Sequence, residues 1–436
     1  MFSLLRSRDF GLLWLAGLIS FTGTAALIFA LPLHIYRETD STLAIAGSLV
    51  ANYLPRVLFS SLAGVFVDRW DRQRTMVVVD AIRAVILLPI LLAPNNLLLL
   101  YAAIGIQGTL ATFFLPAEGA LLPKLVGKEH LVTANALNSL NNNIGMLIGP
   151  AMGTLLYAYV GIGGTVLTNT ATFAGSALLI SLITADARPE RDEMEEPDGS
   201  AMRQVVAEWI DGLGLVRSDR VLMVTMGSSV ANFIADGVFV TLSLSPLVLD
   251  VLGGTPEQVG WMGSAQAVGG LTAGMIVVRL GHRMSKRLLL GGGLIGIGLS
   301  DLGAANARLV ASAGTPAVGV AMGCMAAAGL PAMMAGTGRL TVIQDQTEDA
   351  YRGRVFGTLG SAAGLSLVVG LILGGLLGDA VGLVAMLSMA AILRIAGGLF
   401  VFAFMPRTAV TTGPAQAESS TPPDAGPAVT TELPGP

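Results

Sequence analysis

Long apolar runs separated by short polar turns occupy almost the whole chain. Most of the runs reach the roughly 20 residues that a helix needs to cross the hydrocarbon core of a bilayer. The pattern predicts an all-α integral membrane protein with about twelve spans, at residues 10–36, 42–67, 75–93, 96–119, 132–158, 162–184, 221–249, 257–279, 286–306, 314–343, 354–378 and 382–405. An even number of spans returns both ends of the chain to one side of the membrane.

Basic residues indicate which side that is. Of the 25 lysine and arginine residues, four lie in the interior of the predicted spans and only Arg37 and Arg308 lie in loops on the far side; the other 19 lie in loops or at span ends on the side of the amino terminus. Because cytoplasmic loops carry an excess of Lys and Arg, this distribution predicts a multi-pass protein of the cytoplasmic membrane with both termini in the cytoplasm.

Polar segments divide the chain into four parts. Residues 186–220, an acidic run followed by a predicted surface helix near 205–215, separate a six-span bundle at 1–185 from a second at 221–406. The tail at 407–436 is rich in Pro, Ala, Thr and Gly and has no apolar face to bury, so we expect it to be disordered.

The two predicted bundles look like diverged repeats. Three short patterns recur in the same order, namely Ala63-Gly64, Pro116-Ala117 and Gly145-to-Gly153 in the first half, and Ala273-Gly274, Pro331-Ala332 and Gly370-to-Gly378 in the second. Internal repeats of this kind are typical of transporters that alternate between two states. Val278 replaces the first-half aspartate in the second copy, so we expect the charged turn described next to act mainly in the first half.

The most charged short turn lies between the second and third spans and reads GVFVDRWDRQR, from Gly64 to Arg74. Its spacing resembles the G-x-x-x-D-R-x-x-R-x-R loop of the major facilitator superfamily, although Asp71 stands where that family usually has glycine. The resemblance implies a conformational latch, whose charge-assisted bonds break and re-form as the bundles move. The latch residues would be Gly64, Asp68, Arg69, Arg72 and Arg74. The alternative is a plain hairpin whose basic residues only set orientation.

A second motif, GMLIGPAMG, lies in the fifth predicted span and contains Gly145, Gly149, Pro150 and Gly153. Small residues four apart open a groove for a neighbouring helix, and a proline removes one backbone hydrogen bond and bends its helix. The order also resembles the signature of exporters that work as antiporters within the same superfamily. Simple helix packing is the alternative.

Further resemblance covers most of the chain. It is carried by LLRSRDFGLLWLAGLIS, LPRVLFSSLAGVFVDRWDRQR, FFLPAEGALLPKLVGKEHLVTANALNSL and YRGRVFG. These segments look like the twelve-helix drug–proton antiporter branch, which includes macrolide efflux proteins and the enterobactin exporter.

One departure from the pattern of this branch concerns the fourth span. Many drug antiporters carry an arginine three residues before a Gln-Gly pair, whereas here Ile104 precedes Gln107-Gly108, so coupling through that arginine is not carried over.

Charged residues inside the predicted spans are the candidates for proton or cargo binding, because burying a charge in a membrane is costly. Asp236 is the first choice for a proton-linked carboxylate, with a structural hydrogen bond as its alternative. Asp80 and Arg83 stand three residues apart on one helix face, so they can pair, either structurally or as part of a coupling site.

Other candidates have weaker signals. Glu118 is either a gate carboxylate or a solvated helix end, and Arg56 and Arg394 are placed to meet an anionic cargo or a membrane carboxylate. The residues expected to line a cavity as hydrogen-bonding groups are Asn52, Gln107 and Asn232.

Composition limits the remaining function classes. A chain that is 53% hydrophobic and 12% charged has too little polar surface for a soluble protein. It has one cysteine, three isolated histidines, no phosphate-binding loop, no nucleophile–base set and no basic nucleic-acid patch. We therefore expect no metal, no cofactor, no nucleic-acid partner and no enzymatic activity, with membrane lipid as the surroundings.

Taken together, the resemblance implies a monomeric secondary transporter that exports small amphipathic molecules, as in drug or multidrug efflux, by proton antiport and alternating access. Three alternatives stay open: a dedicated exporter of a self-made metabolite such as a siderophore, a passive facilitator, and a non-transporting membrane scaffold or receptor.

Overall fold

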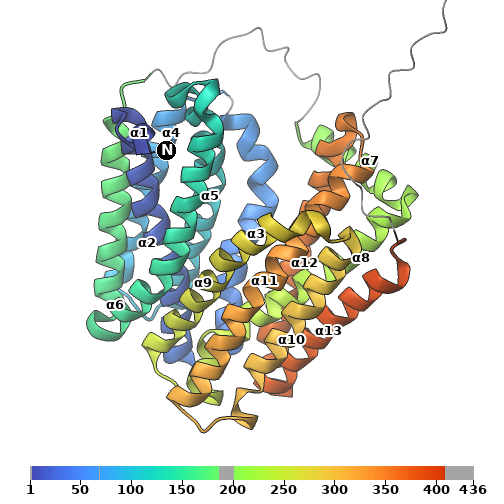
Figure 1. The fold of residues 1–436 in the computed structure, drawn as a ribbon. Helices are drawn as coiled ribbons and strands as arrows, with labels where there is room; N and C mark the ends of the chain where they lie inside the picture. The colour runs from blue at the N-terminus through green and yellow to red at the C-terminus, as the bar shows by residue number, and fades with distance from the viewer. Residues whose placement is uncertain (1, 68, 186–200, 408–436) are drawn as a thin grey trace, which may run out of the picture.

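A computed structural model describes residues 2–67, 69–185 and 201–407, and in these ranges every regular element is a helix (Figure 1). The all-α membrane fold predicted from the sequence is confirmed. Three earlier expectations lie outside the described residues: the latch residue Asp68, the acidic part of the linker at 186–200, and the tail at 408–436.

The first group of helices forms the N-terminal bundle. Its elements are α1 (Phe2–Leu5), α2 (Arg8–Thr39), α3 (Thr42–Val67), α4 (Arg72–Leu87), η1 (Leu88–Leu91), α5 (Leu97–Val126), η2 (Lys128–His130) and α6 (Leu131–Ser181). The third span predicted at 75–93 is α-helical only to Leu87 and ends in a 3-10 turn that contains Pro89, which cannot donate a backbone hydrogen bond.

The helix α6 is 51 residues long and contains two of the predicted spans. Gly161 divides them, because its backbone lies in the left-handed region at φ 70° and ψ −173°. Glycine adopts such a conformation without steric cost, whereas side chains at this φ are strained. Gly161 lies between the predicted spans at 132–158 and 162–184.

The remaining helices form the C-terminal bundle. Its elements are α7 (Ala201–Ser218), α8 (Arg220–Ser243), η3 (Leu247–Val251), α9 (Pro256–Leu280), η4 (Gly281–Arg283), η5 (Leu288–Gly292), α10 (Gly293–Ala305), η6 (Ala307–Leu309), α11 (Thr315–Gln346), η7 (Asp349–Tyr351), α12 (Arg352–Val381) and α13 (Leu383–Phe404). The surface helix expected in the linker is α7. It packs on α12, where the Thr358 hydroxyl donates to the Trp209 carbonyl at 3.3 Å.

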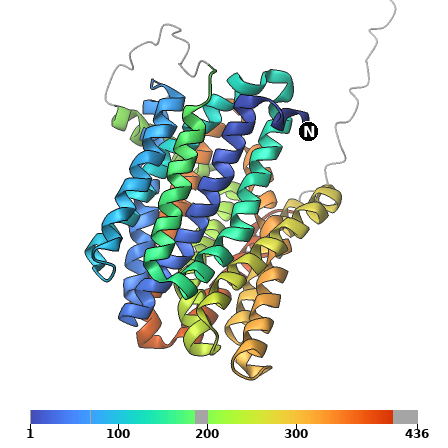
Figure 2. The same cartoon turned by 90° about the vertical axis from the view of Figure 1, so that its left-hand side faces the viewer.

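Nine helical segments of the described chain are long and apolar enough to cross a membrane. One of them is α6, which contains two spans, while α4 and α9 run within the bundles beside the others (Figures 1 and 2). Figure 2 shows α2 and α6 side by side, and they pack along their lengths.

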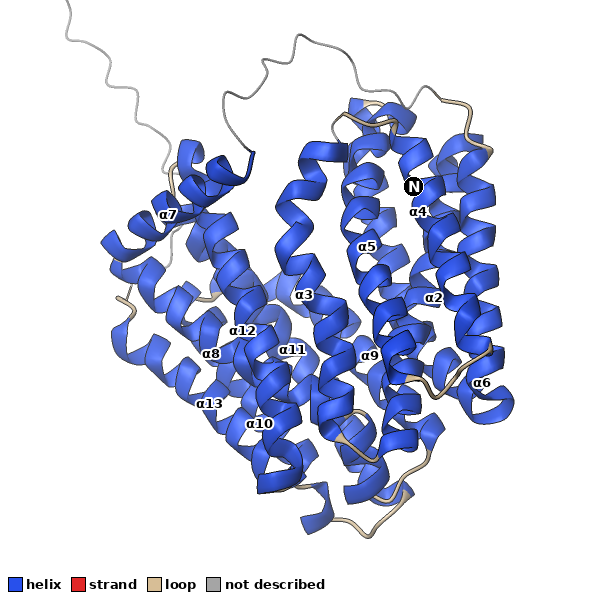
Figure 3. Ribbon diagram, turned by 180° about the vertical axis from the view of Figure 1, so that it is seen from behind, coloured by secondary structure: helices blue, strands red, loops and turns tan. Residues whose placement is uncertain are grey.

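The two bundles meet at the end remote from the amino terminus and diverge toward the end that carries the amino terminus and α7 (Figures 1 and 3). At the meeting end, the Thr42 hydroxyl of α3 donates to the Gly375 carbonyl of α12 at 2.9 Å. Nearby, the Tyr36 hydroxyl of α2 donates to Asp250 in η3. The junction therefore combines close helix packing with hydrogen bonds between the bundles.

Candidate functional site

An arginine bridges two carboxylates in the middle of the C-terminal bundle. Nη2 of Arg394, on α13, donates to Asp236 Oδ1 on α8 at 2.9 Å, and Nη1 contacts Asp301 on α10. We call Asp236, Arg394 and Asp301 the charge triad. Asp236 and Arg394 were expected from the sequence as separate candidates. Asp301 was not expected, although it is a carboxylate inside the predicted span at 286–306.

The two carboxylates of the triad differ in their surroundings. The Asp301 side chain is 4% exposed, whereas that of Asp236 is 43% exposed. A fully buried carboxylate needs its cationic partner, because an unpaired charge in a low-dielectric interior is strongly destabilising. Asp236 is thus the member of the triad that solvent or a ligand can reach.

The triad lines a pocket with an empty volume of about 780 Å³ in the C-terminal bundle. Asn232, one of the expected cavity residues, lines the same pocket. Arg339, from α11, also lines it, with its guanidinium carbon 5.0 Å from the centre of the Phe233 ring. Two carboxylates and two guanidinium groups therefore line this pocket, together with apolar side chains.

The N-terminal bundle contains a second charged group. Arg83 Nη1 lies 3.3 Å from Asp80 Oδ1, and both residues are buried on α4. Phe173 flanks the guanidinium, with its ring centre 5.0 Å from the guanidinium carbon. The amide of Gln107, on α5, donates to the Arg83 carbonyl at 3.0 Å. The i, i+3 spacing seen in the sequence thus does bring the two charges together.

Arg56 and Arg83 line a pocket within the N-terminal bundle. Its walls include Gln107 and Ile104, the residue that stands where many drug antiporters have arginine. The guanidinium carbon of Arg56 lies 5.6 Å from the centre of the Tyr53 ring. Two other helices, α3 and α4, therefore bring guanidinium groups to the pocket that Ile104 lines.

Glu118 is buried in α5, with 7% of the residue exposed. The Asn138 amide of α6 donates to Glu118 Oε1 at 3.2 Å. This burial argues against the alternative of a solvated helix end, and it leaves the role of a gate carboxylate as a prediction.

The glycine motif of α6 packs directly on α2. A methyl group at Gly149 would lie 2.5 Å from Ala25 Cβ, and one at Gly153 would lie 2.6 Å from Ala26 Cα. The contact at Gly145 is looser, because a methyl group there would lie 3.2 Å from Phe21 Cβ. Pro150 faces the other bundle, where a methyl group at Gly260 of α9 would lie 2.8 Å from the Pro150 carbonyl carbon. The motif therefore lies where both bundles touch.

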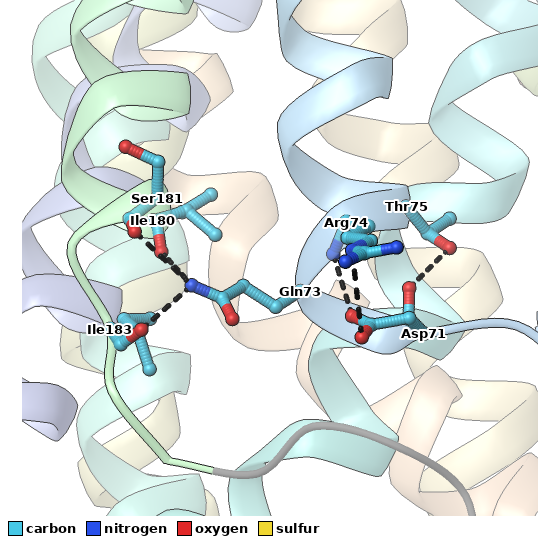
Figure 4. Close-up of polar contacts among 7 residues, drawn as sticks. All are labelled: Asp71, Gln73, Arg74, Thr75, Ile180, Ser181 and Ile183. Atoms are coloured by element: carbon cyan, nitrogen blue, oxygen red, sulfur yellow. Dashed lines mark hydrogen bonds and ion pairs between the residues drawn. The ribbon is translucent and has the colours of Figure 1, made fainter.

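The charged turn begins α4 with a helix cap. Asp71 Oδ1 accepts from the Arg74 backbone N–H at 2.9 Å, and the Thr75 hydroxyl donates to the Asp71 carbonyl at 2.7 Å (Figure 4). An aspartate at this position satisfies a backbone donor that the first helical turn leaves free, which accounts for Asp71 in place of glycine. Arg72 Nη1 donates to the Ala120 carbonyl of α5 at 3.1 Å, while Arg69 is exposed.

The model of the Major Facilitator Superfamily matches residues 13–253 and 230–432. The chain belongs to the Major Facilitator Superfamily. It is accordingly a multi-pass membrane transporter of small molecules and not an enzyme.

Several characterised members of the superfamily are similar to this chain over most of its length. Macrolide efflux protein A of Streptococcus pyogenes is 22% identical over 378 residues, which is 85% of this chain and 89% of that protein. The multidrug efflux pump Tap of Mycolicibacterium fortuitum is 26% identical over 388 residues, covering 85% and 90%. The enterobactin exporter EntS of Escherichia coli is 26% identical over 389 residues, covering 85% and 86%.

A solved structure has a similar arrangement of helices over most of the chain. The bacterial homologue of the iron transporter ferroportin, in an inward-facing state, superposes with a TM-score of 0.68 at 17% identity, covering 91% of this chain and 98% of that one. At this identity the likeness concerns the fold alone.

One contact of this transporter was not expected from its sequence. The Gln73 amide, in the first turn of α4, donates to the carbonyls of Ile180, Ser181 and Ile183 at 2.9, 3.4 and 2.8 Å (Figure 4). These carbonyls lie in the last turn of α6 and just after it, where the end of a helix leaves acceptors without partners. Gln73 therefore ties the start of one span to the end of another.

Replacing Gln73 with alanine is expected to reduce the free energy of unfolding by about 1–2 kcal/mol, because partly buried carbonyl acceptors lose their donor. Thermal unfolding of the purified transporter in detergent measures the effect. The matched control is Arg74→Ala on the same turn, since that side chain is 80% exposed and its ion pair with Asp71 is 4.0 Å long. Equal melting temperatures for the two variants would contradict the assignment.

Proposed function

We propose that this transporter exports small amphipathic molecules across the cytoplasmic membrane in exchange for protons. The names of three similar proteins, a macrolide efflux protein, a multidrug efflux pump and an enterobactin exporter, support export as the direction and amphipathic molecules as the cargo. The observation that carries proton exchange is the charge triad, because it holds a reachable carboxylate and a buried carboxylate on one arginine.

In this proposal Asp236 carries the proton. It faces the pocket of the C-terminal bundle, and Arg394 and Asp301 from α13 and α10 are its charged neighbours there, with Arg339 across the pocket on α11. Proton binding would neutralise Asp236 and leave Arg394 paired with Asp301 alone. The triad, which holds two carboxylates and one guanidinium group, would then change from one net negative charge to none.

Alternating access would follow from the way the bundles meet. The helices diverge toward the end with the amino terminus (Figure 3). The distribution of basic residues predicts that this end lies in the cytoplasm, so the arrangement would face the cytoplasm. When the bundles close at that end, the latch residues would form the charge-assisted bonds that hold the closed state. The latch residues are Gly64, Asp68, Arg69, Arg72 and Arg74. The glycine motif of α6 would provide the contact surface about which the two bundles rotate relative to each other. The transporter would work as a monomer.

The test is uptake of fluorescent amphipathic dyes by everted vesicles, with and without an imposed pH gradient. We expect gradient-driven dye uptake by the native chain. Asp236→Asn should reduce the gradient-driven component by roughly tenfold while leaving downhill movement, because the proton-binding group is gone. The matched control, Asp349→Asn, removes a carboxylate whose side chain is 88% exposed and should behave like the native chain.

Two outcomes would count against parts of this proposal. Gradient-driven uptake that survives Asp236→Asn would remove Asp236 from the coupling role. If no dye moves under any gradient, a dedicated exporter of a self-made metabolite becomes the better proposal, and the similarity to the enterobactin exporter is the observation that favours it.

A further inference from the structure

Arg56 is a membrane-buried arginine without a carboxylate partner in the parts of the chain that the structure describes. It lies on α3 inside the N-terminal bundle, with its guanidinium carbon 5.6 Å from the centre of the Tyr53 ring. Its Nε is buried and has no hydrogen-bond partner. A cation inside a membrane span is costly unless it is paired or faces a functional cavity. Arg56 lines the pocket of the N-terminal bundle, so the second condition is met.

A second arginine reaches the same pocket. Arg83 is 4% exposed and its Nη1 pairs with Asp80, but its buried Nε has no hydrogen-bond partner. Asp80 itself does not line the pocket. Asn52 and Gln107 add amide groups to the wall, and the Asn52 side-chain oxygen also has no partner. The charged groups that line this pocket are therefore guanidinium groups only.

The pocket of the C-terminal bundle differs in this respect. There, Arg394 and Arg339 face Asp236 and Asp301, so cationic and anionic side chains are equal in number. Of these two pockets, only the N-terminal one is lined by more cationic than anionic side chains. An anion would satisfy the free donors of Arg56 and Arg83, since guanidinium groups bind carboxylates and similar oxyanions through paired hydrogen bonds.

We infer that the N-terminal pocket binds the anionic group of the cargo, such as a carboxylate or sulfonate, and that the cargo is an amphipathic anion. Leu27, Leu31 and Phe173 supply apolar walls beside the two arginines, which suits an acidic group joined to an aromatic or aliphatic body. This inference rests on the proposed export function and specifies the chemical class of its cargo.

The test uses a pair of ligands that differ only in charge, 2-naphthoate and 2-naphthamide, titrated calorimetrically into the full-length transporter in detergent. We expect naphthoate to bind at least about tenfold more tightly, because hydrogen bonds to charged groups contribute more than neutral ones. Arg56→Gln should bring the two affinities together, and Arg56→Lys should keep most of the preference because it keeps the charge.

Arg287→Gln is the matched control. Its guanidinium carbon also lies over an aromatic ring, 5.3 Å from the centre of Phe402, and its buried Nε also has no hydrogen-bond partner, but Arg287 lines neither pocket. This variant should leave the preference for naphthoate unchanged. Equal binding of the two ligands to the native chain, or loss of the preference in Arg287→Gln but not in Arg56→Gln, would overturn the inference. Dye uptake in everted vesicles is measured on the same native chain, so a failure of export is seen separately from a failure of anion preference.

Discussion

Replacing Arg394 with glutamine is expected to stop transport and to destabilise the C-terminal bundle by about 3–5 kcal/mol. The guanidinium contacts both Asp301 and Asp236, and the Asp301 side chain is 4% exposed. Glutamine would leave the Asp301 carboxylate buried without a cation. Dye uptake in everted vesicles and thermal unfolding in detergent measure the two effects.

A double variant separates stability from transport. Arg394→Gln combined with Asp301→Asn removes both buried charges, so we expect it to recover most of the lost stability and none of the coupled transport. Arg308→Gln, at an exposed position of η6, is the control and should change neither property. If Arg394→Gln unfolds at the same temperature as Arg308→Gln, the triad does not stabilise the bundle.

Replacing Gly153 with alanine is expected to reduce both the stability and the transport rate of this protein. The added methyl group would overlap the Ala26 carbonyl oxygen and lie 2.6 Å from Ala26 Cα, so the backbones of α2 and α6 would have to separate. Overpacking of this kind costs about 1–3 kcal/mol. Since α6 also touches α9, we expect dye uptake to fall by roughly tenfold, which corresponds to about 1.4 kcal/mol.

The control for this change lies on the same helix. A methyl group at Gly175 would meet no atom within 4 Å, so Gly175→Ala should keep transport and match or slightly exceed the native stability, because alanine favours helices over glycine. The same loss in Gly175→Ala as in Gly153→Ala would show that helix propensity or chain flexibility, and not the contact with α2, causes the effect.

The sequence alone determined the membrane class and the all-helical fold, because a helix must present about 20 apolar residues to the hydrocarbon core and this requirement is local. Local spacing also placed Asp80 and Arg83 on one helix face, where the structure pairs them. The cap formed by Asp71 was readable in the same way, since an aspartate before a helix commonly accepts from its first turn. The sequence comparison did not reveal this cap, because Asp71 was set against the glycine that the superfamily usually has at this position.

The tertiary structure decided which distant groups meet. Asp236, Asp301 and Arg394 come from three helices and are joined only because α8, α10 and α13 turn the right faces toward one another. The donation from Gln73 to the end of α6 and the unpaired state of Arg56 among the described residues have the same origin. Periodicity defines the faces of each helix, but which faces pack together depends on the fit of all the helices, so contacts between residues far apart in the chain are decided at that level.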